Sequence, residues 1–256
     1  MYRWSAVFFF LIVFSIDSLS QGLERLLRNG DECFARQATE EARRYYDQAY
    51  ALSPQNSETL LRLVRTYCDL GWLHLRTDTS SEMYYLHAEA YAETLLSLNP
   101  TMASAHFWMA LTKGSLIPFN TVSEKIRIGK EVRFHAEKAV ELDSTFALAY
   151  VVLAVFERES SQLSWFERTI ARIIFGADIN GSLLHSEELL KKSIQYDPGN
   201  SYAFYEMYFT DMAMGKKDAA VESLKKVLAL PVKSQREEKL HRLAQEYLAG
   251  FDVTTR

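Results

Sequence analysis

Six histidines, two cysteines and the acidic residues are the side chains of this 256-residue chain that could support acid–base, nucleophilic or metal chemistry. They occur in none of the patterns that such chemistry usually requires. The sequence has no His-Glu-x-x-His pair, no Cys-x-x-Cys, no phosphate-binding glycine loop and no nucleophile elbow. We therefore expect no catalytic residue, no metal site and no cofactor. An enzyme would need distant carboxylates to converge on folding, and it is the least favoured function class.

The individual histidines and cysteines have simpler interpretations. His106 takes a position where a repeat helix usually buries an aromatic ring, which predicts core packing rather than ligation. His135 and His185 have charged neighbours and are expected to be solvated or interhelical. Cys33 and Cys68 fall in the first helices of successive units. Equivalent positions on stacked helices lie ~8–10 Å apart, so two free core thiols are expected rather than a disulfide.

The amino-acid composition indicates which kind of secondary structure holds these residues. The chain has five prolines and ten glycines, and 48% of its residues are hydrophobic. Few helix breakers, with Ala, Leu, Glu, Lys and Arg frequent, favour an all-α protein. The net charge of −4 and the lack of a basic cluster argue against a nucleic-acid partner.

Turn signals recur along the chain and divide it into units. Similar short turns, each closing a helical stretch, occur at Pro54, Pro100, Ser144, Pro198 and Pro231. The last interval is close to the ~34-residue tetratricopeptide period, whereas the earlier ones are longer. The surplus predicts insertions, which we place at 68–80, 113–121 and 160–182. Ala110, Ala139 and Ala154 are expected where helices touch.

These observations predict an all-α, tetratricopeptide-like solenoid of helical hairpins with extended helices. Five units span residues 21–250, a C-terminal capping helix covers about 234–250, and 251–256 form a tail. Residues 1–20 contain Arg3, an apolar run over 6–14, and the small residues Ser18 and Ser20. This pattern is typical of a signal peptide cleaved before Gln21, and predicts export to the periplasm or cell envelope.

The first helices of such units line the concave face, so helical register predicts a binding surface. In the first two units this surface is charged, with Glu24, Arg28, Asp31, Leu61, Arg65 and Asp69. In the later units it is apolar, with Phe107, Leu111, Leu148, Val151, Val155, Tyr202, Tyr205, Phe209 and Met212. The candidate ligand-binding residues are Phe107, Leu111, Val151, Val155, Tyr202, Tyr205, Phe209, Met212 and Arg65. This trough either holds an apolar ligand or is filled by the protein itself.

Two further apolar segments could touch a membrane surface. One is the loop 116–119 and the other is the stretch of Trp165, Phe166, Ile170, Ile173 and Ile174. Because the second set recurs at helical spacing, ordinary packing against neighbouring helices is the expectation, and any membrane association should be weak.

Three longer stretches resemble one family. They are 125–130 running into 134–142, then 163–168, and then 228–238. Their order and spacing are similar to the regulator of microtubule dynamics family over about 24–248, and this chain is expected to be an exported, bacterial-type relative. The resemblance implies a non-catalytic helical-repeat protein, in a family associated with microtubules or membrane contact sites and with lipid binding in the concavity.

Two function classes follow. The first is an exported binding protein that holds a hydrophobic small molecule, lipid or acyl chain in its concave face. The second is a protein–protein interaction scaffold of the cell envelope that binds a peptide or partner subunit through its charged N-terminal units. Salt separates them, because ionic strength weakens charged contacts and hardly affects apolar ones.

Overall fold

The computed structural model describes residues 20–74, 79–176 and 180–254, and over these residues it contains helices and no strand. The first helix spans residues 20–35. The following elements are α2 (Thr39–Leu52), α3 (Ser57–Leu73), α4 (Thr79–Leu98), α5 (Ala103–Leu116), the 3₁₀ helix η1 (Ile117–Phe119), α6 (Val122–Leu142), α7 (Ala147–Ser161), α8 (Trp165–Phe175), α9 (Leu183–Tyr196), α10 (Ser201–Ala213), α11 (Lys217–Ala229) and α12 (Gln235–Thr254).

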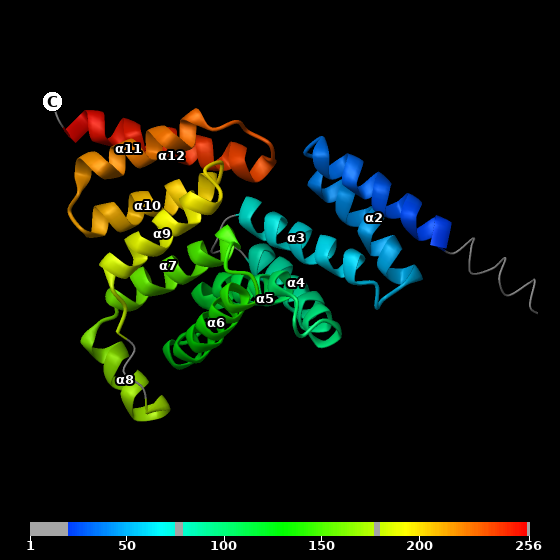
Figure 1. The fold of residues 1–256 in the computed structure, drawn as a ribbon, viewed down its shortest axis with the longest axis horizontal. Coiled ribbons are helices and arrows are strands. Elements are labelled where there is room, and N and C mark those ends of the chain that lie inside the picture. Colours follow the sequence, from blue (N-terminus) through cyan, green and yellow to red (C-terminus); the bar gives the residue numbers. More distant parts are fainter. Residues whose placement is uncertain (1–19, 75–78, 177–179, 255–256) are drawn as a thin grey trace, which may run out of the picture.

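The helices pack as successive hairpins. The first helix packs on α2 through Leu27, Cys33, Ala42 and Tyr46. The pairs α3 and α4, α5 and α6, α7 and α9, and α10 and α11 follow, and α12 lies on α11. Figure 1 shows the hairpins stacked side by side along one curved array. The predicted all-α, tetratricopeptide-like solenoid is therefore confirmed.

The turn residues predicted from the sequence lie between helices, and neighbouring residues cap the helix ends. Each of the five turns separates two helices, so the punctuation read from the sequence is confirmed. The side chain of Asn56 accepts a hydrogen bond from the Thr59 backbone N–H at 2.8 Å and so caps α3. Asn200 caps α10 in the same way, and Gly215, at φ 74°, ends that hairpin's first helix in a left-handed conformation.

Small residues set the distance between paired helices. Ala110, Ala139 and Ala154 are fully buried, as expected from their register. Among the glycines within these helices, Gly30 shows the closest approach, because a Cβ atom there would lie 2.3 Å from Cε1 of Tyr46. Such contacts require glycine, since real Cβ atoms do not come so near an aromatic ring.

The insertions take three forms. The first extends α3 to Leu73, before α4 begins at Thr79, and the second contains η1. The third contains α8, a complete extra helix between the paired helices α7 and α9. Gly181 lets the chain re-enter the array after α8, because a Cβ there would lie 2.0 Å from the Glu157 carbonyl oxygen.

The array also closes on itself, because α12 contacts α3 as well as its neighbours α10 and α11. Gln235 Oε1 accepts a hydrogen bond from the Thr39 hydroxyl at 2.8 Å. Lys239 Nζ donates to the Trp72 carbonyl oxygen at 2.6 Å. Figure 1 shows the start of α12 beside the end of α3. A helix expected to cap only the last repeat therefore also holds the second one.

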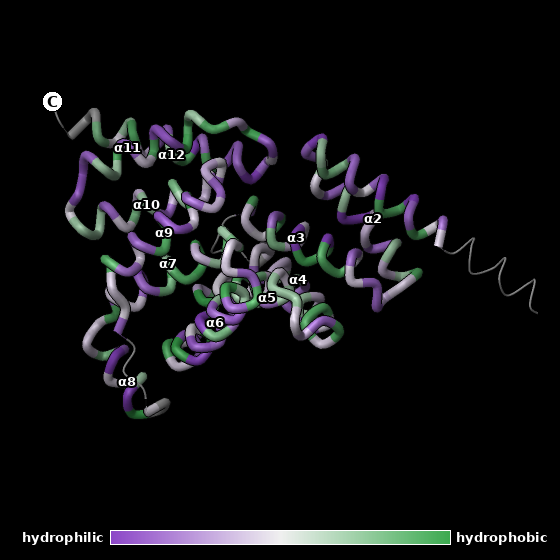
Figure 2. Tube along the Cα trace, viewed as in Figure 1, coloured by the Kyte–Doolittle hydropathy of each residue, from purple (hydrophilic) through white to green (hydrophobic). Residues whose placement is uncertain are grey.

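Hydrophilic and hydrophobic residues alternate along most helices, as Figure 2 shows, because each helix has one packed face. Cys33 and Cys68 are free and buried in one apolar cluster, which confirms the expectation of core thiols. Burial raises the pKa of the Cys68 thiol to about 12. Among the described residues no helix is long and apolar enough to span a membrane.

Candidate functional site

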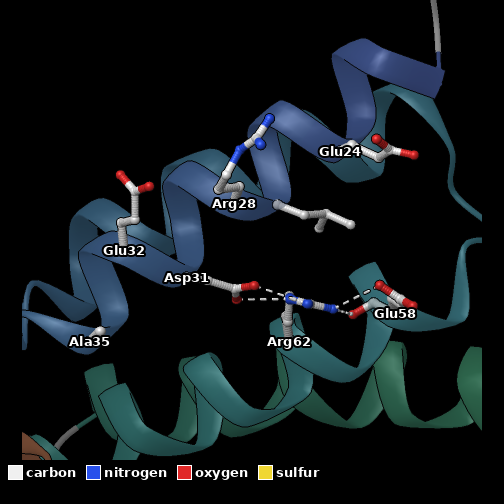
Figure 3. Close-up of a pocket in the computed structure, with 8 residues that line it drawn as sticks. Glu24, Arg28, Asp31, Glu32, Ala35, Glu58 and Arg62 are labelled. Carbon is white, nitrogen blue, oxygen red and sulfur yellow. Dashed lines mark hydrogen bonds and ion pairs between the residues drawn. The ribbon is translucent and has the colours of Figure 1, made fainter.

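An open groove of about 450 Å³ lies between the first helix and α3, the first helices of the first two hairpins. Figure 3 shows its two walls. The groove is lined by Glu24, Leu27, Arg28, Asp31, Glu32, Ala35, Glu58 and Arg62. Four carboxylates face two guanidinium groups, so the lining is acidic. Glu24, Arg28 and Asp31 were predicted as surface residues of this unit, and the structure brings them together.

Asp31 and Arg62 join the two walls. Arg62 Nε donates to Asp31 Oδ1 at 2.8 Å and its Nη2 donates to Oδ2 at 2.9 Å, a two-point ion pair. The Tyr46 hydroxyl also donates to Asp31 Oδ1, at 2.7 Å. Burial alone would raise the pKa of Asp31, but these hydrogen bonds and the charge of Arg62 hold that pKa below its usual value. Asp31 is therefore a fixed anion that sets the width of the groove.

Glu24, Arg28 and Glu32 form a different set, four residues apart along one face of the first helix. All three side chains are exposed. Within the described part of the chain none of them forms a hydrogen bond or an ion pair, whereas Arg62 is held by Asp31 and by Glu58, the latter at 3.3 Å. In Figure 3, Arg28 and Glu32 extend away from the Asp31–Arg62 pair. They form a row of negative, positive and negative charge that a ligand can meet without breaking an internal contact.

The predicted apolar trough is divided among three separate clusters. Phe107 and Leu111 pack with Phe146 and Ala149, and Val151 and Val155 pack with Tyr150 and Ala154. The remaining four belong to a cluster that also contains Leu240 and Ala244 of α12; they are Tyr202, Tyr205, Phe209 and Met212. The structure thus brings together residues within each hairpin and does not bring all eight together.

Two predicted residues of the second unit lie elsewhere. The Arg65 guanidinium stacks over the Phe34 ring, 3.9 Å from its centroid, and its Nε is buried without a partner among the described residues. Asp69 is buried and accepts a hydrogen bond from Arg236 Nη1 at 3.0 Å. Burial raises the pKa of Asp69, and the charge of Arg236 partly offsets that rise. Asp69 therefore joins α3 to α12 rather than facing a ligand.

Two of the six histidines, His106 and His135, form a pair. Nδ1 of His106 lies 3.0 Å from Nδ1 of His135, and His106 Nε2 lies 3.1 Å from the Pro100 carbonyl oxygen. Buried His106 and interhelical His135 match what the sequence indicated. Over the described ranges, no group of three His, Cys, Asp or Glu side chains is arranged to hold a metal ion.

Sequence reasoning missed five groove residues: Leu27, Glu32, Ala35, Glu58 and Arg62. Glu32 lies four residues after Arg28, and Ala35 lies four residues after Asp31, so a wider helical face would have included them. Glu58 and Arg62 required knowing how the first helix and α3 are placed. The expectation that Trp165, Phe166 and Ile173 pack against neighbouring helices is wrong, since their side chains are 79%, 59% and 76% exposed.

Comparison with known proteins agrees with this architecture over most of the chain. The family model of regulator of microtubule dynamics protein 1-3 matches residues 26–252. Regulator of microtubule dynamics protein 1 of Bos taurus is 23% identical over 231 residues, which cover 90% of this chain and 72% of that protein. Protein 3 of Rattus norvegicus is 27% identical over 56% of this chain, which spans only 30% of that relative's length.

Solved structures show the same fold. A thermophilic tetratricopeptide protein of Thermus thermophilus has a TM-score of 0.65 at 15% identity, with 89% of this chain and 99% of that chain covered. Pseudomonas aeruginosa pilF has a TM-score of 0.54 at 11% identity, with 93% and 91% covered. The stacked hairpins and the match over residues 26–252 lead to one conclusion. The chain belongs to the regulator of microtubule dynamics protein 1-3 family.

Proposed function

We propose that this chain is a non-catalytic protein-interaction scaffold that holds a charged peptide segment of a partner in the groove between the first helix and α3. One observation supports the proposal: Glu24, Arg28 and Glu32 present charges along the rim of that groove that form no ion pair with any residue the structure describes. Charges that a protein does not use internally cost little to offer to a partner, and they select partners of complementary pattern. Tetratricopeptide arrays commonly bind through such extended surfaces.

The spacing of the charges specifies the ligand. Glu24 and Glu32 are eight residues apart on one helix, or about 12 Å at 1.5 Å per residue. A peptide with two basic side chains separated by about that distance can reach both carboxylates. An acidic group between them can meet Arg28. Leu27, which lines the groove, gives the same peptide a small apolar contact.

The test is fluorescence anisotropy with the full chain and a labelled ten-residue peptide carrying Arg at positions 3 and 7 and Asp at position 5, because four residues of extended chain span about 13 Å. Binding should weaken at least fivefold between 50 and 300 mM NaCl, because exposed charges are screened by salt. The E24Q/E32Q variant should lose most of the affinity. E93Q/E246Q removes the same charge from exposed positions of α4 and α12 and should bind like the parent chain. Equal binding by both variants would contradict the proposal.

The hydrophobic-ligand hypothesis stays a prediction. Its candidate residues are distributed over three clusters, and one of those clusters is filled by α12. This distribution supports the peptide groove more than a lipid trough. The hypothesis is tested by extracting the purified chain for mass spectrometry and by titrating a fluorescent fatty acid. A bound lipid whose uptake falls in Phe107→Asp would support it.

We also propose export to the periplasm or cell envelope. The support is the apolar run over 6–14 followed by Ser18 and Ser20. Residues 1–19 lie outside the residues that the structure describes. Fusion of residues 1–25 to alkaline phosphatase should give activity outside the inner membrane, and an inactive fusion would contradict export.

A further inference from the structure

The inserted helix α8 has three large apolar side chains in solvent. Trp165, Phe166 and Ile173 are 79%, 59% and 76% exposed, whereas Ala171 is fully buried. The helix contacts α6 and projects from the stacked hairpins at the edge of the molecule (Figure 1). A flat surface can therefore reach it without meeting the rest of the array.

The three exposed side chains share one face. At about 100° per residue, Ile173 lies about 80° and Phe166 about 100° around the helix axis from Trp165. Ala171 lies on the opposite side, where α8 meets the protein. Three large apolar side chains of α8 thus point toward solvent on one face, while the small Ala171 faces the protein.

The charges at the border of this face are positive. Arg168 and Arg172 are exposed and one turn apart, next to Trp165 on the helix surface. Arg168 Nε donates to the Leu163 carbonyl oxygen at 3.0 Å, and its Nη2 donates to the Ser161 carbonyl oxygen at 2.9 Å. These two bonds fix the side chain at the start of the helix. The one carboxylate of α8, Glu167, accepts hydrogen bonds from the backbone N–H and the hydroxyl of Ser164, at 2.8 and 2.7 Å.

The exposed apolar area of α8 and the positive charges beside it indicate what kind of surface binds there. Three large side chains expose about 400–500 Å², since a Phe, Tyr or Trp covers 150–250 Å². A stable dimer buries about 800 Å² per partner, so a second copy of this chain would find too small a surface. Insertion into a bilayer interface needs only such a short apolar face. Tryptophan favours that depth, and flanking arginines can pair with lipid phosphates.

We propose that the exposed face of α8 docks on an anionic phospholipid bilayer, with Trp165, Phe166 and Ile173 at the acyl boundary and Arg168 and Arg172 at the phosphates. This contact is separate from the peptide groove of the first two hairpins. A chain with both surfaces would hold a partner peptide next to a membrane.

The experiment uses the full chain with vesicles of 70% phosphatidylcholine and 30% phosphatidylglycerol, some of whose lipids carry brominated acyl chains. The fluorescence of W165F, subtracted from that of the parent chain, isolates Trp165 from the three other tryptophans. We expect this Trp165 component to shift to the blue and to be quenched at least twofold. Vesicles of phosphatidylcholine alone should quench it less. Every variant carries the same residues 1–20, so that apolar segment contributes equally throughout.

Three variants sharpen the result. W165S/F166S/I173S should lower vesicle affinity at least tenfold, and R168Q/R172Q should lower it severalfold while R168K/R172K restores it. M83S/L86S removes two exposed apolar side chains of α4 and should bind like the parent chain. An unquenched Trp165 component overturns the proposal. It is also overturned by undiminished binding of the triple variant, or by a dimer in the parent chain that the triple variant makes monomeric.

Discussion

Gly30 determines how closely the two helices of the first hairpin approach. A Cβ atom at this position would lie 2.3 Å from Cε1 of the fully buried Tyr46. Gly30→Ala should therefore destabilise the protein by about 1–3 kcal/mol in urea unfolding, because the ring must move and the Asp31 hydrogen bond moves with it. Gly250 is the matched control, since a Cβ there meets nothing within 4 Å. Gly250→Ala should be neutral or stabilise by about 0.5–1 kcal/mol. Equal effects would contradict the close approach.

The pair of His106 and His135 makes the stability of the protein depend on pH. The Pro100 carbonyl only accepts, so neutral His106 is protonated at Nε2 and its Nδ1 accepts from His135 Nδ1–H. Burial first, and then the charges of His106 and Lys113, lower the pKa of His135 to about 4, against a rise from Glu131. The unfolded chain, with an ordinary histidine pKa of about 6.5, binds more protons between these values. The contribution of His135 to the free energy of unfolding is therefore complete above pH 6.5 and is lost as the pH falls toward 4.

His135→Asn should make that loss of stability shallower, because the amide can donate to His106 and does not titrate. The measurement is the free energy of unfolding in urea between pH 4 and 8. Leu86→Asn places the same amide at an exposed position of α4 that does not titrate, and should leave the slope as it is. A parent chain whose stability is flat from pH 6.5 to 4 would rule out a shifted His135.

Arg236 of α12 pairs with Asp69 of α3, which lies 167 positions earlier in the sequence. It also donates to the Tyr202 hydroxyl and stacks over the Trp72 ring, 5.6 Å from its centroid. Arg236→Met leaves the Asp69 carboxylate buried without its cation and should cost about 3 kcal/mol in denaturant unfolding. D69N/R236M should recover more than half of that loss. Lys225→Met breaks an exposed pair with Glu222 at 3.9 Å and should cost less than about 0.5 kcal/mol.

At the level of elements, sequence periodicity was sufficient for the hairpins and insufficient for what joins them. Turn residues such as Pro54 and capping residues such as Asn56 act locally, so they can be read along the chain. The exposure of Trp165 could not be read, because helical spacing predicts an apolar face without telling whether another helix covers it. The Asp31–Arg62 and Asp69–Arg236 pairs depend on superhelical curvature. That curvature is the sum of small rotations at every hairpin, and no single segment encodes it.

The whole molecule departs from a one-dimensional array because α12 contacts α3. In a linear solenoid each repeat responds only to its neighbours. Here, a chain that ends at residue 233 should lose amide hydrogen-exchange protection in α3 as well as in α10 and α11, since it lacks the donors Arg236 and Lys239. The amides of α6 should stay protected, because that helix is covered by α5 and α7. A chain that ends at residue 250 keeps these contacts and should match the full chain in α3. Should the shorter chain unfold altogether, R236M/K239M in the full chain tests the same contact. Unchanged α3 protection in both would mean that the array is open and that α12 caps only the last repeat.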